Sequence, residues 1–396
     1  WLTAHGYFNF DGSRLQDIHV FNGLLLFIFF GLFFTEILKV DINFSFNQII
    51  LFSILLFILI KFTRLKEFGI DRPAIIFFCY IIYIYLKYLM FDYGENILEY
   101  FIIILLVSLS IISIKIIYVP VLIFSFAYFL KNKNKLNVFS IKYFLILFVL
   151  IVFLLKNFLS TGCIIYPIEF SCFDFVSWSN LKAAQELTFL GEYFNKSWTS
   201  YEGQLNKEEY VKNFNWFNTW FARGKVEIIE LFATIFLVFV ISLTIFGFKT
   251  KSYKHKKQIN FLRNILTIIA ISSFLIFIIK NPVIRMNFHF LISFLIIILI
   301  FFVNFNINEN KIKLMKLFII LGFFFNFYKN IDRIINVDFV NDPISTISQK
   351  IYAPKEEKLD GFTYYVGWYG NAPIGYKLLE NKKYKKKFIF NIISNN

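Results

Sequence analysis

Long apolar runs recur along this 396-residue chain and limit its fold more than any other feature. Several approach or reach the roughly 20 residues that a helix needs to cross a bilayer. Because lipid offers the backbone no hydrogen-bond partner, such runs must form helices. The runs cover residues 18–38, 46–61, 73–90, 98–113, 118–131, 141–157, 228–248, 261–280, 289–305 and 313–328. We therefore expect an all-α integral membrane protein, a polytopic bundle of about ten transmembrane helices.

Composition and charge agree with this class. The hydrophobic share is 58% and the charged share only 17%, whereas apolar residues make up near half of a soluble domain. A net charge of +15 could indicate a nucleic-acid partner. The basic residues instead cluster in short loops between the apolar runs, which is typical of the cytoplasmic loops of membrane proteins. We expect membrane lipid as a partner and no nucleic acid.

Three basic loops set the expected orientation. Loops 131–142 and 249–263 contain no acidic residue, and loop 306–316 contains only Glu309. Placing all three in the cytoplasm of a bacterial inner membrane gives the following multi-pass arrangement. The expected parts are a truncated periplasmic loop at 1–17, six spans within 18–157, a periplasmic loop domain at 158–227, four spans within 228–328 and a periplasmic tail at 329–396.

Two spans, 98–113 and 118–131, are separated by so few residues that we expect a tight hairpin. A single merged crossing would have about 34 residues, too long for a 30 Å hydrocarbon core. In the predicted periplasmic domain, Asn180–Phe194 has the periodicity of an amphipathic helix. The polar-aromatic stretch Glu208–Arg223 follows; both segments either pack along the membrane surface or contact carbohydrate or lipid. In the tail, the Gly- and Pro-rich stretch Gly361–Ile374 favours a loop or short strand.

The cysteines allow one disulfide. Cys163 and Cys172 both fall in the outward segment, where an oxidising periplasm permits a bond between them; two free thiols are the alternative. Cys79 lies inside a span and is expected to be a small buried residue. None of the four histidines has ligand spacing to these cysteines, so no metal site is expected there.

Two aspartates are candidate catalytic residues. Asp71 stands just before Pro73 at the start of a span, where it either caps the helix or binds a divalent cation or a sugar hydroxyl. Asp11 precedes Gly12, a turn signal, in a polar loop ahead of the first span. Lys115, Lys156, Arg285 and His289 lie at the outward ends of helices. They either extend to the membrane surface or hold the phosphate of a lipid-linked donor.

Three short motifs carry a family resemblance. The segment Lys156–Pro167, with Gly162, Tyr166 and Pro167, resembles the Ser-Gly-…-Tyr-Pro motif that opens a periplasmic loop in a largely uncharacterised group of polytopic GT-C type glycosyltransferases. Ile70–Ala74 is similar to the Asp-x-Pro element of that group, and Ser113–Lys115 to its hairpin. The family's usual catalytic carboxylate comes from the first outward loop, which the start of this chain interrupts.

The resemblance implies an inverting enzyme that transfers a sugar from a polyprenyl-phosphate donor to a glycan or lipid acceptor of the cell envelope. It implies a carboxylate role for Asp11 or Asp71, phosphate contacts from Lys115, Lys156, Arg285 and His289, and stacking by Tyr166. No cofactor is required by this pattern, although a divalent cation remains an option. A polymerase or ligase, a transporter or flippase, and a non-enzymatic scaffold are the alternatives. The absence of inverted repeats disfavours a transporter.

Overall fold

The chain folds into two compact units in the computed structural model. Unit 1 comprises Trp1–Tyr143 and Asn195–Arg333, and unit 2 comprises Phe144–Phe194 and Ile334–Asn396. The structure describes residues 27–37, 45–62, 71–91, 97–134, 141–166, 168–176, 179, 181–197, 205–249, 256–336, 355–359, 362–369, 372–375, 382–387 and 390–395.

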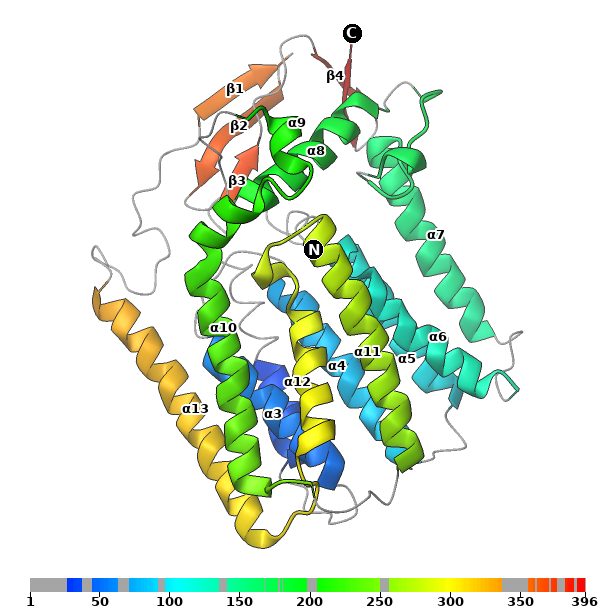
Figure 1. The fold of residues 1–396 in the computed structure, drawn as a ribbon. Helices are drawn as coiled ribbons and strands as arrows, with labels where there is room; N and C mark the ends of the chain where they lie inside the picture. The colour runs from blue at the N-terminus through cyan, green and yellow to red at the C-terminus, as the bar shows by residue number, and fades with distance from the viewer. Residues whose placement is uncertain are drawn as a thin grey trace. The chain divides into compact units, whose positions relative to one another are not determined.

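Unit 1 is a helical bundle in which successive long helices run antiparallel (Figure 1). It begins with a helix at Phe27–Ile37. The labelled elements are α3 (Ser45–Lys61), α4 (Asp71–Phe91), α5 (Ile97–Ile114), η3 (Ile116–Val121), α6 (Leu122–Asn132), α9 (Lys207–Val211), α10 (Phe217–Phe246), α11 (Lys256–Ile279), η5 (Ile284–Met286), α12 (Phe288–Phe302) and α13 (Glu309–Asn336).

Helix α3 is the centre of this bundle. Its four consecutive residues 52–55 are each fully buried, so every face of the helix is covered. It packs against α4, α10 and α12, and Gly322 of α13 approaches it closely. A helix that is apolar all round is expected in the interior, and α3 has that composition.

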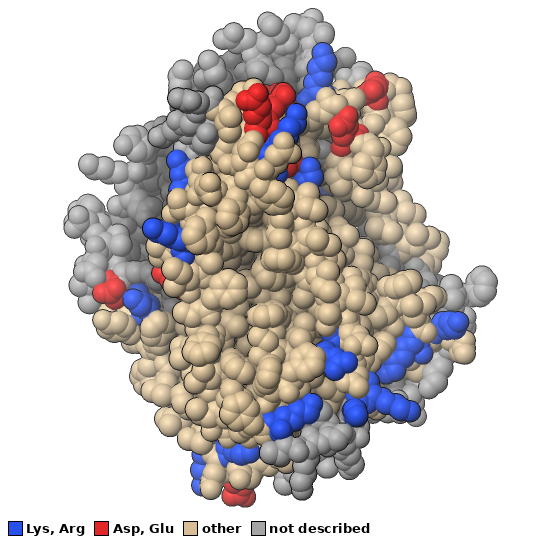
Figure 2. Space-filling view, in the orientation of Figure 1, with Lys and Arg blue, Asp and Glu red and all other residues tan. Residues whose placement is uncertain are grey.

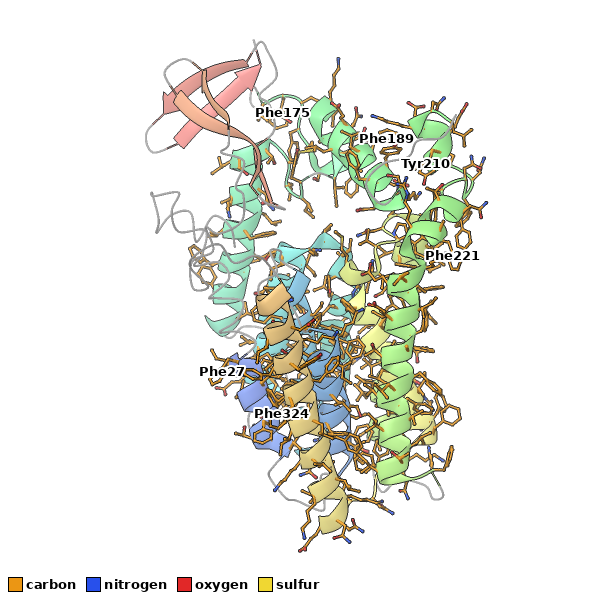
Figure 3. All side chains as sticks on the ribbon, turned by 90° about the vertical axis from the view of Figure 1, so that its left-hand side faces the viewer. Phe27, Phe175, Phe189, Tyr210, Phe221 and Phe324 are labelled. Atoms are coloured by element: carbon orange, nitrogen blue, oxygen red, sulfur yellow. A yellow bond between two sulfur atoms is a disulfide. The ribbon has the colours of Figure 1, made fainter. Side chains whose placement is uncertain are left out.

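The outer helices present apolar side chains away from the core. Phe236 of α10, Ile271 of α11 and Phe324 of α13 are each more than half exposed. The visible face of the molecule carries few charges across its middle (Figure 2). Aromatic side chains such as Phe27 and Phe324 extend from neighbouring helices (Figure 3), whose Phe30 and Phe323 rings lie 5.5 Å apart. Exposed apolar surface of this extent indicates contact with lipid.

The membrane class predicted from the apolar runs agrees with these helices. A helix lies at each of the ten predicted runs. Within the described residues, four helices are long and apolar enough to cross a bilayer: α5, α10, α11 and the part of α13 at Glu309–Asp332. Shorter apolar helices lie at Phe27–Ile37, Phe46–Lys61, Ile116–Asn132, Leu150–Thr161 and Phe288–Phe302. The chain is therefore a helical membrane protein.

The predicted hairpin is present as α5, η3 and α6. Lys115 interrupts the helix with an extended backbone, φ −147° and ψ 115°. The two arms then pack together, and the hydroxyl oxygens of Ser108 and Ser125 lie 3.2 Å apart. The structure thus has two helices here and not one long crossing.

Helix α10 begins earlier than expected. The prediction started the span at residue 228, but the helix starts at Phe217. Its first turns contain Trp220, whose indole Nε1 donates to the carbonyl of Pro282 at 2.6 Å. No proline interrupts residues 217–246, and this tertiary contact fixes the early turns, so the polar-aromatic stretch continues directly into the span.

Unit 2 contains most of α7 (Ile141–Thr161), η4 (Glu169–Ser171) and most of α8 (Leu181–Ser197), the predicted amphipathic helix. The tail contributes strands β1 (Lys355–Leu359), β2 (Phe362–Tyr369), β3 (Ala372–Gly375), β4 (Lys382–Lys387) and β5 (Phe390–Asn395). Strands β1, β2 and β3 form one antiparallel sheet, and β4 and β5 form a hairpin. The predicted short-strand alternative for the tail is confirmed at β2 and β3. The two units divide the predicted 158–227 domain between residues 194 and 195.

Candidate functional site

One lysine from each of the three basic loops, Lys131, Lys249 and Lys311, lies at the same end of unit 1, called the basic end below. The ammonium of Lys131, at the end of α6, lies 5.4 Å from the ring centroid of Phe261 in α11. The backbone N–H of Lys249 donates to the carbonyl of Phe302 at 2.9 Å. Lys311 donates to the last carbonyl of α10 at 3.2 Å. Lys and Arg side chains gather at this lower end (Figure 2), so basic loops that are far apart in sequence share one side of the bundle.

The opposite end, called the polar end below, is held together by side-chain hydrogen bonds. Trp220 donates to Pro282 there. The amide Nδ2 of Asn326 donates to the carbonyls of Leu59 at 3.0 Å and Phe62 at 3.1 Å. These carbonyls belong to the C-terminal end of α3, where a helix leaves acceptors without intrahelical partners. Asn326 therefore caps α3 from α13.

A buried histidine and a buried tyrosine are in ring contact at the polar end. The rings of His289, in the first turn of α12, and Tyr118, in η3, have centroids 4.1 Å apart and an interplanar angle of 34°. Both side chains are fully buried, and Phe78 of α4 packs on the imidazole with a centroid distance of 6.1 Å. Within the described residues, neither the imidazole nitrogens nor the phenol oxygen has a hydrogen-bond partner.

Two asparagines extend this group. Asn287, just before α12, donates from Nδ2 to the carbonyls of Asn281 and Val283, both at 2.9 Å. The side-chain oxygens of Asn281 and Asn287 are buried and have no partner in the described part of the chain. Tyr118, Asn281, Asn287 and His289 are called the buried polar cluster below. Each polar atom left without a partner in the interior costs about 1–3 kcal/mol.

Four predicted site residues belong to elements of the polar end. Asp71 is the first residue of α4, as the helix-start interpretation requires. Lys115 directly precedes η3, and its carbonyl accepts from the N–H of Tyr118 at 3.1 Å. Arg285 lies in η5, and His289 belongs to the buried polar cluster. The side chains of Asp71 and Arg285 lie outside the described part of the structure.

Two further predicted residues belong to unit 2. Lys156 lies in α7, and Tyr166 follows that helix. Partial burial raises the pKa of the Tyr166 phenol. The predicted substrate-binding residues are therefore divided between the two units. Asp11 lies outside the described residues.

The loop after α7 is closed by a disulfide between Cys163 and Cys172. Backbone bonds reinforce it: the N–H of Ile164 donates to Ser171 at 2.8 Å, and that of Phe173 donates to Gly162 at 3.0 Å. Gly162 ends α7 with a φ of +75°, a conformation in which glycine is strongly favoured. Local backbone geometry thus explains the glycine of the motif noted in the sequence.

No group of three or more His, Cys, Asp or Glu residues that could hold a metal occurs among the described residues. A divalent cation at Asp11 or Asp71 stays a prediction.

The sequence did not single out Tyr118, Asn281 or Asn287. Each is one polar residue beside an apolar run, and such residues more often mark the ends of helices. The available signal was spacing: Asn281 and Asn287 bracket a short loop that also contains the predicted Arg285 and leads to His289. Only the packing of η3 against α11 and α12 brings Tyr118 to this loop.

Comparison with known proteins identifies a family. A family model described as a domain of unknown function, DUF8201, matches residues 1–292. The matched region includes all four residues of the buried polar cluster. No curated protein and no solved structure matches the chain.

Proposed function

The chain belongs to the DUF8201 family, and since that family carries no assigned function, we propose one: a GT-C type membrane glycosyltransferase. The enzyme transfers a sugar from a polyprenyl-phosphate donor to a glycan or lipid acceptor of the cell envelope. In this proposal, the chain crosses the bacterial inner membrane about ten times, and the reaction takes place on the periplasmic side.

The observation that supports this proposal best is the difference between the two ends of unit 1. Lys131, Lys249 and Lys311 are at one end. Cytoplasmic loops are enriched in Lys and Arg, so this end is assigned to the cytoplasm. The polar end then belongs to the periplasm, together with the elements that begin at Asp71 and contain Arg285.

The proposed chemistry needs two kinds of group. A carboxylate, Asp71 or Asp11, accepts the proton of the acceptor hydroxyl as the anomeric bond breaks. Cationic groups stabilise the departing phosphate, a role proposed for Lys115 and Arg285 of unit 1. Tyr166 offers an aromatic ring for contact with sugar or isoprenoid. The motif resemblance and the position of these residues at the ends of helices support the assignment.

Cysteine labelling in intact cells tests the orientation. Asp71→Cys and Lys254→Cys are made in a chain in which Cys79, Cys163 and Cys172 are replaced. An impermeant maleimide is expected to label position 71 and spare position 254. Labelling of position 254 with protection of position 71 would invert the topology and remove the basis for a periplasmic reaction.

Transfer is then measured with membranes and a radiolabelled polyprenyl-phosphate sugar. Asp71→Asn is expected to reduce transfer by about 10²–10⁴-fold, the contribution of a positioned general base. Asp174→Asn, a matched change at a residue with no proposed role, should retain activity. Wild-type membranes that move the lipid-linked sugar across the bilayer without transferring it would favour a flippase instead.

A further inference from the structure

We propose that the buried polar cluster of Tyr118, Asn281, Asn287 and His289 binds a hydroxyl group and not a phosphate. The existence of the binding site is argued only from the burial of these four residues and from their polar atoms that are unpaired within the described part of the chain. The further step, in which the hydroxyl belongs to the donor sugar or to a lipid acceptor, rests on the proposed glycosyltransferase function.

The first argument is the number of polar atoms that require a partner. Tyr118, Asn287 and His289 are fully buried, and Asn281 is 6% exposed. Five of their polar atoms have no hydrogen-bond partner in the described residues: the Tyr118 hydroxyl, both imidazole nitrogens and the two amide oxygens. Buried polar groups are almost always hydrogen-bonded, and a cluster of exceptions needs an explanation such as a bound group.

The second argument is the kind of hydrogen bond that the cluster offers. Asn287 uses its Nδ2 to donate to two carbonyls, and this network leaves its oxygen as an acceptor. Asn281 donates from Nδ2 to the sulfur of Met286 at 3.5 Å, so its oxygen is also an acceptor. A neutral imidazole adds one donor and one acceptor, and a phenol can do both.

This mixture matches a hydroxyl group, which both donates and accepts. A hydroxyl donates to one of the three acceptors, which are the two amide oxygens and one imidazole nitrogen, and accepts from the phenol or the imidazole N–H. An ionised phosphate only accepts, so it would leave all three acceptors without a donor. The phosphate role predicted for His289 is therefore better assigned to Lys115 and Arg285 in the neighbouring elements. The tilted ring contact, with centroids 4.1 Å apart, holds the imidazole and the phenol side by side.

The test is binding to the purified full chain in lipid nanodiscs. The chain has four histidines, so the ¹⁵N signals of the His289 imidazole are identified by their loss in His289→Gln. The probes share an eight-carbon chain and differ in the polar group: octyl glucoside, monooctanoylglycerol and octyl phosphate. Octyl glucoside or monooctanoylglycerol should shift the His289 signals, and octyl phosphate should not. The first probe represents a sugar hydroxyl and the second a glycerolipid hydroxyl, so the pair distinguishes the two sources.

Tyr118→Phe, which removes only the hydroxyl, should weaken binding of the effective probe about tenfold, the loss of one hydrogen bond worth about 1.4 kcal/mol. Tyr128→Phe is the matched control, because that buried hydroxyl is already used by the carbonyl of Ile97, and it should leave affinity unchanged. Asn281→Leu provides a second variant that removes an acceptor and should also weaken binding.

A response to octyl phosphate alone would make the cluster an anion site and overturn the proposal. No response to any probe, or equal affinity in wild type, Tyr118→Phe and Asn281→Leu, would reduce the cluster to packing around buried water and overturn it as well. Probe binding without any sugar transfer would keep this site and reject the glycosyltransferase. Sugar transfer without probe binding at His289 would keep the glycosyltransferase and reject this site.

Discussion

Tyr118 and Tyr128 are both fully buried tyrosines of the α5–α6 hairpin region. They differ in one respect: the Tyr128 hydroxyl donates to the carbonyl of Ile97 at 3.0 Å, while the Tyr118 hydroxyl has no partner in the described residues. Removing a satisfied hydroxyl costs a hydrogen bond, and removing an unsatisfied one relieves a desolvation penalty.

We therefore expect opposite effects on the free energy of unfolding without ligand. Tyr128→Phe should lower it by about 1 kcal/mol, and Tyr118→Phe should leave it unchanged or raise it by up to about 1 kcal/mol. Thermal unfolding in detergent, followed by tryptophan fluorescence, measures the difference. Equal destabilisation by both changes would mean that Tyr118 has a partner in the folded protein.

Gly162 gives a second prediction at the level of one residue. Besides its positive φ, a Cβ at this position would lie 2.4 Å from Cβ of Ser179. Gly162→Ala should destabilise unit 2 by roughly 2–4 kcal/mol, combining backbone strain with steric overlap. Gly247 also has a positive φ, but a Cβ added there would meet no described atom within 4 Å.

Gly247→Ala is thus the matched control and should cost only the backbone strain, about 1–3 kcal/mol. Limited proteolysis of the loop after α7 reports the effect on unit 2 directly. Faster cleavage is expected in Gly162→Ala than in Gly247→Ala, and equal rates would show that neither the positive φ of Gly162 nor its contact with Ser179 stabilises unit 2.

At the scale of elements, Asn326 joins α13 to the end of α3 with two hydrogen bonds. Asn326→Ala should lower the free energy of unfolding by about 2–3 kcal/mol, because two buried carbonyls lose their donor. Asn330, one turn later, donates to Asn326 within the same helix, so Asn330→Ala should cost less than half as much. Hydrogen exchange at the end of α3 should accelerate in the first variant alone.

The helices themselves were predictable because a run of apolar residues has few other structures in lipid. This explains the agreement at α3, α4 and α5, whose bounds fall within two residues of the predictions. The start of α10 was missed because Trp220 and Arg223 have the local pattern of surface residues. Their tertiary hydrogen bonds, to Pro282 and to the carbonyl of Ser197, decide the outcome.

The candidate site was predictable only in part. Proximity to helix ends selected Asp71, Lys115, Arg285 and His289, since loops must lie outside the hydrocarbon. The partner of His289 could not be found in this way: Tyr118 is 171 positions earlier in the chain. Such pairs depend on the three-dimensional packing of helices, and one sequence contains no local pattern that specifies it.

At the scale of the whole molecule, the redox state of the three cysteines indicates whether a segment lies in an oxidising compartment. The structure has one disulfide, Cys163–Cys172, and one buried free thiol, Cys79. When the chain is denatured without reductant, maleimide–polyethylene glycol should modify one cysteine, and after reduction it should modify three. In the Cys163→Ser variant, two cysteines, Cys79 and Cys172, should be modified without reductant. Three reactive thiols before reduction would argue against an oxidising compartment for this loop.

The central place of α3 has a consequence for how the protein is made. The hydroxyl of Ser53 lies 3.0 Å from that of Ser242 in α10, 189 positions later. At about 5–20 residues per second, the ribosome supplies Ser242 roughly 10–40 s after Ser53. During that interval, the face of α3 that ends up against α10 and α12 has only lipid or an insertion chaperone beside it. A nascent chain that stalls before α10 therefore leaves this surface of α3 uncovered, and membrane quality control can recognise such an incomplete bundle.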